Sequence, residues 1–166
     1  MRAMSLEEAL RIIGGTFAAA AARKLRPLSA IVLDAGGRVK AFQKQDGCSL
    51  LRFEIAYGKA YAALSLGRSS RLVLQKSREK PIFMENLQKL ADGPMFLEGG
   101  GQLVRDTAGE VVGALGVTGD VNEMDDLCAV EGIHAAGFRT DYDFDDPDQI
   151  FAYNIKEGAL PEPPGR

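Results

Sequence analysis

Hydrophobic and polar positions repeat with helical spacing at the start of the chain and with strand spacing soon after it. A first helix is predicted from Ser5, because Ser5 and Glu8 form a capping-box pattern ahead of a single apolar stripe. Gly14 and Gly15 weaken the helix preference but allow a neighbouring backbone to approach closely. Pro27 ends this helix. The stripe consists of Leu6, Leu10, Ile13, Phe17 and Ala21.

A hairpin and several helices follow the first helix. Residues 29–33 are rich in β-forming side chains, and the turn Asp34-Ala-Gly-Gly37 leads to a return strand over 38–44. Residues 50–66 form a helical pattern with a broad apolar face that contains many small side chains. Two shorter helices are predicted over 69–79 and 81–91, the second with proline at its first position.

Three short strands are predicted in the second half of the chain, at 95–98, 102–105 and 111–118, before a helix over 122–136. This order of elements is typical of an α+β fold. We therefore expect a five-stranded antiparallel sheet with the first and last helices on one side.

The strand at 111–118 is the centre of this prediction. The sequence VVGALGVTGD has glycine at 113, 116 and 119, and such a strand suits the middle of a sheet, where other backbone or a ligand comes close. The GxxGxxG spacing differs from the GxGxxG of dinucleotide-binding turns. We expect either close packing against these glycines or a ligand pocket where the strand meets the last helix.

Composition and charge exclude several classes of protein. An apolar content of 46% fits a single globular domain, and a net charge of −3 lacks the basic footprint of a nucleic-acid binder. No run of 18 apolar residues is present, so no membrane span is expected. Cys48 and Cys128 form no CxxC motif and are expected to be free thiols in a reducing compartment. Charged residues interrupt the N-terminal alanine run, so we expect no signal peptide and a cytoplasmic protein.

Two isolated polar residues are candidates for ligand binding. His134 is the only histidine, and it either ligates iron, acts as a base or is a partly buried helix residue. Lys59 interrupts an apolar helix face and either reaches solvent or pairs with an anion. Its expected anionic neighbours are Asp34, Asp46 and Asp126. A single histidine without a CxxC motif argues against a structural zinc site, and no metal site is predicted.

The C-terminal residues differ from the rest in composition. We predict a domain over 1–138 and an acidic, aromatic extension over 139–166. The density of aromatic residues predicts that this extension packs against its own domain or a second subunit. These aromatic residues are Phe138, at the boundary with the domain, and Tyr142, Phe144, Phe151 and Tyr153 within the extension.

Four segments together resemble the HbpS and GlcG family of heme-binding proteins, whose domain also forms the C-terminus of the PduO cobalamin adenosyltransferase. These segments are IVLDAGGRVKAFQKQDG, AYGKAYAALSLGRSS, VVGALGVTGD and MDDLCAVEGIHAAGF, and the similarity covers about residues 5–138. The resemblance implies a profilin-like α/β/α fold, a dimer or octamer, and heme or a corrinoid as ligand. The family's motifs match Asp34 and Gly37, Asp46 and Gly47, Lys59 and Ala60, Gly113, Gly116, Val117 and Gly119, and Asp125 to Ala129.

The first helix departs from the family because it contains no histidine, although heme ligation from that helix is known in the family. A heme bound to this chain would use His134, Tyr57, Tyr61, a methionine or no protein ligand.

We predict a homo-oligomeric protein that binds heme, a corrinoid or a small organic acid metabolite in a pocket between the central strand and the helices. Lys59 would pair with a ligand carboxylate, and the glycines would give room for a flat ring. The alternative is an enzyme or accessory subunit acting on a small organic acid in a catabolic pathway, with Lys59 or an aspartate as the proton-transfer group. A third hypothesis is a regulatory subunit whose oligomer surface is its function. The predicted binding residues are Asp46, Lys59, Gly116, Thr118, Asp126 and His134.

Overall fold

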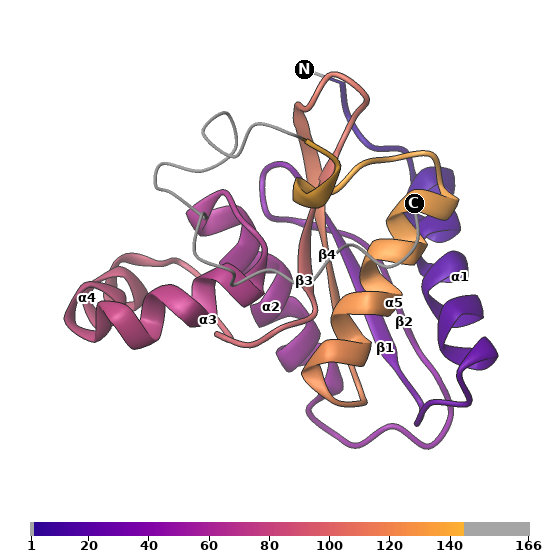
Figure 1. Ribbon diagram of the computed structural model, residues 1–166, viewed down its shortest axis with the longest axis horizontal. Helices are drawn as coiled ribbons and strands as arrows, with labels where there is room; N and C mark the ends of the chain where they lie inside the picture. The colour runs from indigo at the N-terminus through magenta and orange to yellow at the C-terminus, as the bar shows by residue number, and fades with distance from the viewer. Residues whose placement is uncertain (1, 145–166) are drawn as a thin grey trace.

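Four strands form one antiparallel sheet between two layers of helices in the computed structural model, which describes residues 2–144 (Figure 1). The strands are β1 (Ser29–Asp34), β2 (Val39–Lys44), β3 (Gly101–Arg105) and β4 (Val111–Thr118), and their order in the sheet is β2-β1-β4-β3. The helices are α1 (Leu6–Ala22), α2 (Arg52–Leu66), α3 (Ser70–Glu79), α4 (Pro81–Leu90) and α5 (Asn122–Ala135), followed by the 3-10 turn η1 (Asp141–Asp143).

The two faces of the sheet are covered by different helices. Helices α1 and α5 cover one face, as predicted for the terminal helices, and α2 covers the other (Figure 1). Successive side chains of a strand point to opposite faces, and this alternation divides the core in two. The sheet residues facing α1 and α5 are Ala30, Val32, Val104, Val112, Leu115 and Val117. Those facing α2 are Ile31, Leu33, Leu103 and Ala114.

The α+β class is confirmed, but the predicted fifth strand at 95–98 is wrong. This segment has no strand pairing, because the backbone N–H of Phe96 donates to the carbonyl oxygen of Gly58 in α2 at 3.1 Å. Gly58 makes this approach possible, since a β-carbon there would lie 2.8 Å from the β-carbon of Phe96. The segment therefore crosses a helix instead of extending the edge of the sheet beyond β3.

Local sequence signals set the start of α1 and its packing against α5. Ser5 and Glu8 form the predicted capping box at the start of α1, with each side chain bonded to the other residue's backbone N–H. Gly15 provides the predicted close approach, because a β-carbon there would lie 2.8 Å from that of Ala135 in α5. The two helices therefore pack nearly backbone to backbone.

Residues 138–144 contact the rest of the domain. Phe138 is buried in the core beside α1 and α5, and Arg139 exchanges two backbone hydrogen bonds of 2.8 Å with Arg105 of β3. The buried Asp141 accepts from Arg105 Nε at 2.7 Å. Phe151 and Tyr153 lie outside the described residues. The division into a 1–138 domain and a C-terminal extension stays a prediction.

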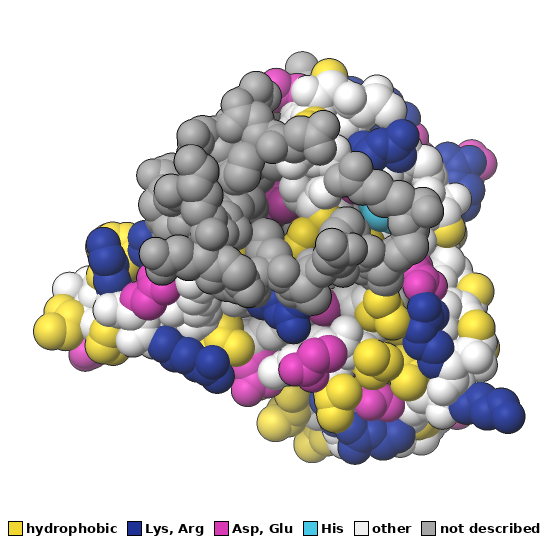
Figure 2. Space-filling model, viewed as in Figure 1, with side chains coloured by type: hydrophobic (Ala, Val, Ile, Leu, Met, Phe, Trp, Pro, Cys, Tyr) yellow, Lys and Arg dark blue, Asp and Glu magenta, His cyan; other side chains and the backbone are white. Residues whose placement is uncertain are grey.

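Several hydrophobic side chains remain exposed in the described part of the chain. The tip formed by α4 carries hydrophobic side chains, visible at the left edge of Figure 2. On this helix Ile82, Phe83 and Leu90 are 75%, 47% and 81% exposed.

Cys48 and Cys128 are free thiols, as predicted. Among the described helices, none has the length and apolar character needed to cross a membrane.

Candidate functional site

Lys59 is fully buried and does not reach solvent. It pairs with an anion, the second predicted alternative, but the partner is Asp125 and not Asp34, Asp46 or Asp126. Its ammonium group donates to the backbone oxygen of Val117 at 3.0 Å and to Asp125 Oδ2 at 3.1 Å. Only 2% of the lysine side chain and 1% of the Asp125 side chain are exposed. Burial raises the pKa of Asp125 above its ordinary value, and the Lys59 ammonium opposes that rise. The pair therefore connects α2 to β4 and α5, which leaves Lys59 no open side for a ligand.

The space beside Gly116 is filled by α2. A β-carbon on Gly116 would overlap the carbonyl oxygen of Ala56, so this glycine allows the helix to lie directly on β4. Thr118 is also buried, and its hydroxyl accepts a hydrogen bond of 2.8 Å from Arg52 Nη1. Protein backbone therefore occupies the place beside Gly116 that was assigned to a flat ring, and the ligand-binding roles of Gly116 and Thr118 stay predictions.

Asp126 is buried and only partly satisfied. Its Oδ1 accepts from the backbone N–H of Gly100 at 2.8 Å and from Gln102 Nε2 at 2.9 Å. Its Oδ2 has no hydrogen-bond partner among the described residues, and Arg71 Nε lies 3.7 Å away. Burial raises the pKa of this carboxyl. A half-satisfied buried carboxylate is the kind of group that a ligand completes.

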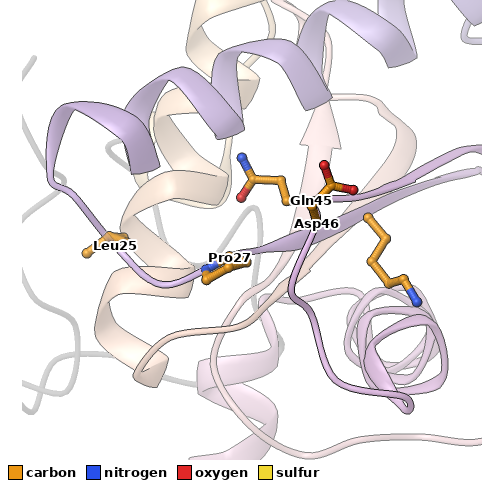
Figure 3. A pocket seen from close by; sticks show the side chains of 5 residues that line it. Leu25, Pro27, Gln45 and Asp46 are labelled. Atoms are coloured by element: carbon orange, nitrogen blue, oxygen red, sulfur yellow. The ribbon is translucent and has the colours of Figure 1, made fainter.

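Asp46 lies in a different place, on the turn after β2. It lines an open groove of about 510 Å³ together with side chains from the segment between α1 and β1 (Figure 3). Gln45 in the same groove already accepts the backbone N–H of Leu28 at 2.7 Å. The other lining residues are Leu25, Pro27 and Lys44.

His134 lies near the C-terminal end of α5 and is separate from the other candidates. Its Nε2 lies 2.7 Å from Asp143 Oδ2, and 24% of its side chain is exposed. Asp143 also accepts from the backbone N–H of Thr140, so it is fixed in position. Eight residues separate Asp126 from His134, which is about 12 Å along a helix axis. The predicted site residues therefore do not form one constellation.

Sequence reasoning missed the polar cluster around β3. Gln102 is fully buried and holds Asp126, while Tyr142 from η1 lies close enough to Asp126 for that charge to act on its phenol. Burial, with Asp126 adding to it, raises the pKa of Tyr142 to about 12. The signal for this cluster in the sequence was a polar residue, Gln102, directly before the apolar pair Leu103 and Val104 of a short strand.

A second missed feature is a row of aromatic rings, here called the aromatic ladder, formed by Phe42 of β2 and by Phe53, Tyr57 and Tyr61 of α2. Phe53 meets Phe42 edge to face at a centroid distance of 4.9 Å and stacks with Tyr57 at 6.3 Å. Tyr57 stacks with Tyr61 at 5.7 Å. The signal was present in the sequence, since residues 53, 57 and 61 are four apart and so share one helix face.

The ladder continues into exposed apolar surface at the start of α2. Leu50, Leu51 and Phe53 are 85%, 57% and 39% exposed. Several exposed apolar side chains within four residues indicate a binding surface more often than an isolated exposed side chain does. Within residues 2–144, no group of three or more metal-ligating side chains is present.

Comparison with known proteins gives both a family and a fold. The family model described as "Haem degrading protein HbpS-like" matches residues 4–134. No curated protein matches the sequence.

Solved structures share the fold at low sequence identity. A PduOC:heme complex is 21% identical, covers 84% of this chain and 99% of its own, and has a TM-score of 0.73. The Klebsiella pneumoniae protein ORFY is 20% identical, with coverages of 82% and 92% and a TM-score of 0.70. A double mutant of Streptomyces reticuli HbpS is 21% identical, with coverages of 81% and 87% and a TM-score of 0.70.

Proposed function

The chain belongs to the HbpS-like family, and from this premise we propose that its small ligand is heme. The family description refers to haem, and one structure of the same fold is a complex with heme. The aromatic ladder is the observation on this chain that carries the proposal. It offers what a porphyrin requires, namely a broad apolar surface that is accessible and lined by rings.

The residues of the ladder fit a heme group in three respects. Phe53 and its exposed neighbours Leu50 and Leu51 supply apolar area, and aromatic faces stack on flat rings. Tyr57 and Tyr61 supply phenol oxygens, an established type of axial ligand for heme iron. Lys44 lies two residues after Phe42 on β2 and therefore on the same face of the sheet, where its ammonium would pair with a heme carboxylate.

His134 is the competing ligand for the iron. Its hydrogen bond with Asp143 resembles the carboxylate partner that usually orients a metal-ligating histidine, which would leave Nδ1 for the metal. However, no exposed aromatic row comparable with the ladder adjoins it among the described residues. We therefore assign the heme to the ladder and treat His134 as the alternative to be excluded.

Titration with hemin, followed by the Soret band, tests the assignment in wild type and in Tyr57→Phe, Tyr61→Phe and His134→Ala. We expect saturation at one equivalent per chain, with a Soret maximum that changes in one tyrosine variant and not in His134→Ala. The phenylalanine variants keep the ring and remove only the oxygen. A spectrum altered by His134→Ala alone would move the site to α5.

Two finer predictions remain to be tested in the same samples. A corrinoid is the second ligand implied by the resemblance, and we expect aquocobalamin to bind more weakly than hemin because its bulky axial faces suit a flat surface less well. The homo-oligomer, a dimer or an octamer, stays a prediction. Light scattering during size-exclusion chromatography would give the subunit count.

A further inference from the structure

Arg52, at the first position of α2, is flanked in sequence by exposed apolar side chains at the start of the aromatic ladder. These neighbours are Leu51 and Phe53. Its Nη1 donates to the hydroxyl oxygen of the buried Thr118 at 2.8 Å, which fixes the direction of the guanidinium group. Among residues 2–144, no carboxylate forms an ion pair with Arg52. A guanidinium group has five N–H donors, so most of them remain available to an anion.

A second cation, the exposed Lys44, lies at the same end of the sheet. Ser29 of β1 pairs with Lys44 of β2 on one side and with Thr118 of β4 on the other. Directly paired residues point to the same face of a sheet, and Ser29 precedes Ile31, which faces α2, by two positions. The three side chains therefore form one row on the α2 side. Adjacent strands lie about 4.8 Å apart, so Lys44 and the Thr118–Arg52 pair are about 10 Å apart across the sheet.

The acidic side chains that are close in sequence to this row leave both cations unpaired. Asp120, just after β4, is held by the backbone N–H of Arg26 at 2.9 Å and by its Nε at 3.5 Å. Glu54 lies two positions after Arg52, and residues so spaced on a helix do not face each other. Asp46, in the turn after β2, is exposed and pairs with no basic side chain in the described part of the chain.

This arrangement matches a flat apolar ring that carries two carboxylates on one edge. Phe42 precedes Lys44 by two residues on β2 and faces the same way, and it meets Phe53 edge to face at 4.9 Å. The ladder therefore begins beside the two cations and runs away from them along α2 to Tyr57 and Tyr61. Heme has this construction, because both of its propionate groups leave the same edge of the porphyrin.

We infer that Arg52 and Lys44 bind the two carboxylates of the heme, and that Thr118 is the residue that positions Arg52. The inference rests on the proposed function and adds to it the residues that select a porphyrin with free carboxylates. A guanidinium group binds a carboxylate through two parallel hydrogen bonds, whereas an ammonium group acts as a point charge. The start of α2 adds partial positive charge at the same place, where Leu51 supplies no side-chain cap. Arg52 is therefore the stronger and more directional anchor.

Titration with hemin and with hemin dimethyl ester, followed by the Soret band, tests the inference. The ester keeps the ring and the iron but has no ionisable carboxylate. We expect wild type to bind hemin about tenfold or more tighter than the ester. Arg52→Gln should lose about tenfold in hemin affinity and keep its affinity for the ester, and Lys44→Gln should show a smaller loss of the same kind. Arg11→Gln, an exposed arginine of α1 that pairs with Glu7, is the matched control and should bind both compounds like wild type.

Two substitutions of Thr118 separate the positioning of Arg52 from packing. Thr118→Val keeps the branched shape and removes the hydroxyl, whereas Thr118→Ser keeps the hydroxyl. Thr118→Val should reduce the preference for hemin over the ester, and Thr118→Ser should retain it. If Thr118→Val changes the affinities for hemin and the ester equally, Thr118 has a structural role alone and its assignment as a positioning residue is overturned.

The failure of this inference is distinguishable from the failure of the proposed function. Unchanged hemin affinity in Arg52→Gln, or an equal loss for hemin and the ester with native circular dichroism, would overturn the inference and leave heme on the ladder. Equal affinities of wild type for hemin and the ester would have the same meaning. No saturable binding of hemin by wild type would overturn the proposed function and this inference together.

Discussion

Replacing Lys59 with methionine removes the cationic half of a buried ion pair while keeping the length of the side chain. Both partners are almost completely buried, and the ammonium group bonds to Asp125 and to the backbone oxygen of Val117. The variant would leave Asp125 with the backbone N–H of Asp120 at 3.0 Å but without its countercharge. Leaving one member of a buried pair uncompensated costs about 3–5 kcal/mol, so we expect the free energy of unfolding to fall by that amount.

Urea denaturation at pH 7 measures this loss, with two further variants to define its cause. Lys59→Met combined with Asp125→Asn is expected to recover about 1–3 kcal/mol, since no unpaired charge then remains. Lys89→Met is the control for the loss of a lysine, because its pair with Glu85 is about two-thirds exposed on both sides. An exposed pair contributes about 0–1 kcal/mol, so this variant should unfold close to wild type.

The pH dependence gives an independent check on the same pair. Burial raises the folded-state pKa of Asp125, and loss of Lys59 would raise it further. The destabilisation in Lys59→Met should therefore grow as pH rises through that pKa and shrink toward about pH 4, near the ordinary aspartate value. A loss below about 1 kcal/mol at pH 7 would refute this reasoning. If such a small loss of stability came together with weakened ligand binding in Lys59→Met, Lys59 would again be assigned to the ligand-binding site.

Two further changes test the packing of β4 and the burial of Asp126. Gly116→Ala should lower the free energy of unfolding by about 3 kcal/mol or more, because the added methyl group overlaps the carbonyl oxygen of Ala56. Gly14→Ala should raise the free energy of unfolding by about 0.4–1 kcal/mol, because its methyl group would lie in open space. Thermal unfolding of the two variants measures both changes, and equal effects would contradict the close packing of α2 on Gly116. Asp126→Asn should gain stability relative to wild type as pH rises, because the pKa of Asp126 is raised and wild type therefore loses stability as this group ionises. If the difference in free energy of unfolding between the variant and wild type does not change with pH, the burial of Asp126 is contradicted.

Elements with strong local signals could be predicted from the sequence. The capping box at Ser5, the hairpin around Asp34 and the helix after Asp120 all appear where their patterns place them. The segment at 95–98 could not be assigned correctly, because the length and side chains of a short apolar run are the same whether it pairs with a strand or crosses a helix. The contact of Phe96 with Gly58 decides the matter, and it depends on two residues 38 positions apart.

The candidate site was harder to predict because burial and pairing are tertiary properties. The acids near Lys59 were expected from their places at the ends of elements, but the helical turn of α5 puts Asp125 on the lysine and rotates Asp126 toward β3. The glycines of β4 were compatible with either a ligand or a helix backbone, and α2 fills the space. The four-residue spacing of Phe53, Tyr57 and Tyr61 was the one readable signal for the aromatic ladder.

The most direct measurement of the central claim is hemin affinity in Phe53→Ser and Phe83→Ser, with the Soret band as readout. Both phenylalanines are partly exposed, 39% and 47%, but Phe53 belongs to the aromatic ladder and Phe83 lies on α4. Full burial of a phenylalanine is worth about 1.5–3 kcal/mol, and the 39% of Phe53 that is exposed could contribute about 0.6–1.2 kcal/mol to hemin binding. Phe53→Ser should therefore weaken hemin binding about three- to eightfold, while Phe83→Ser leaves it unchanged. Equal affinities in the two variants, or binding that never saturates in wild type, would contradict a heme site on the ladder.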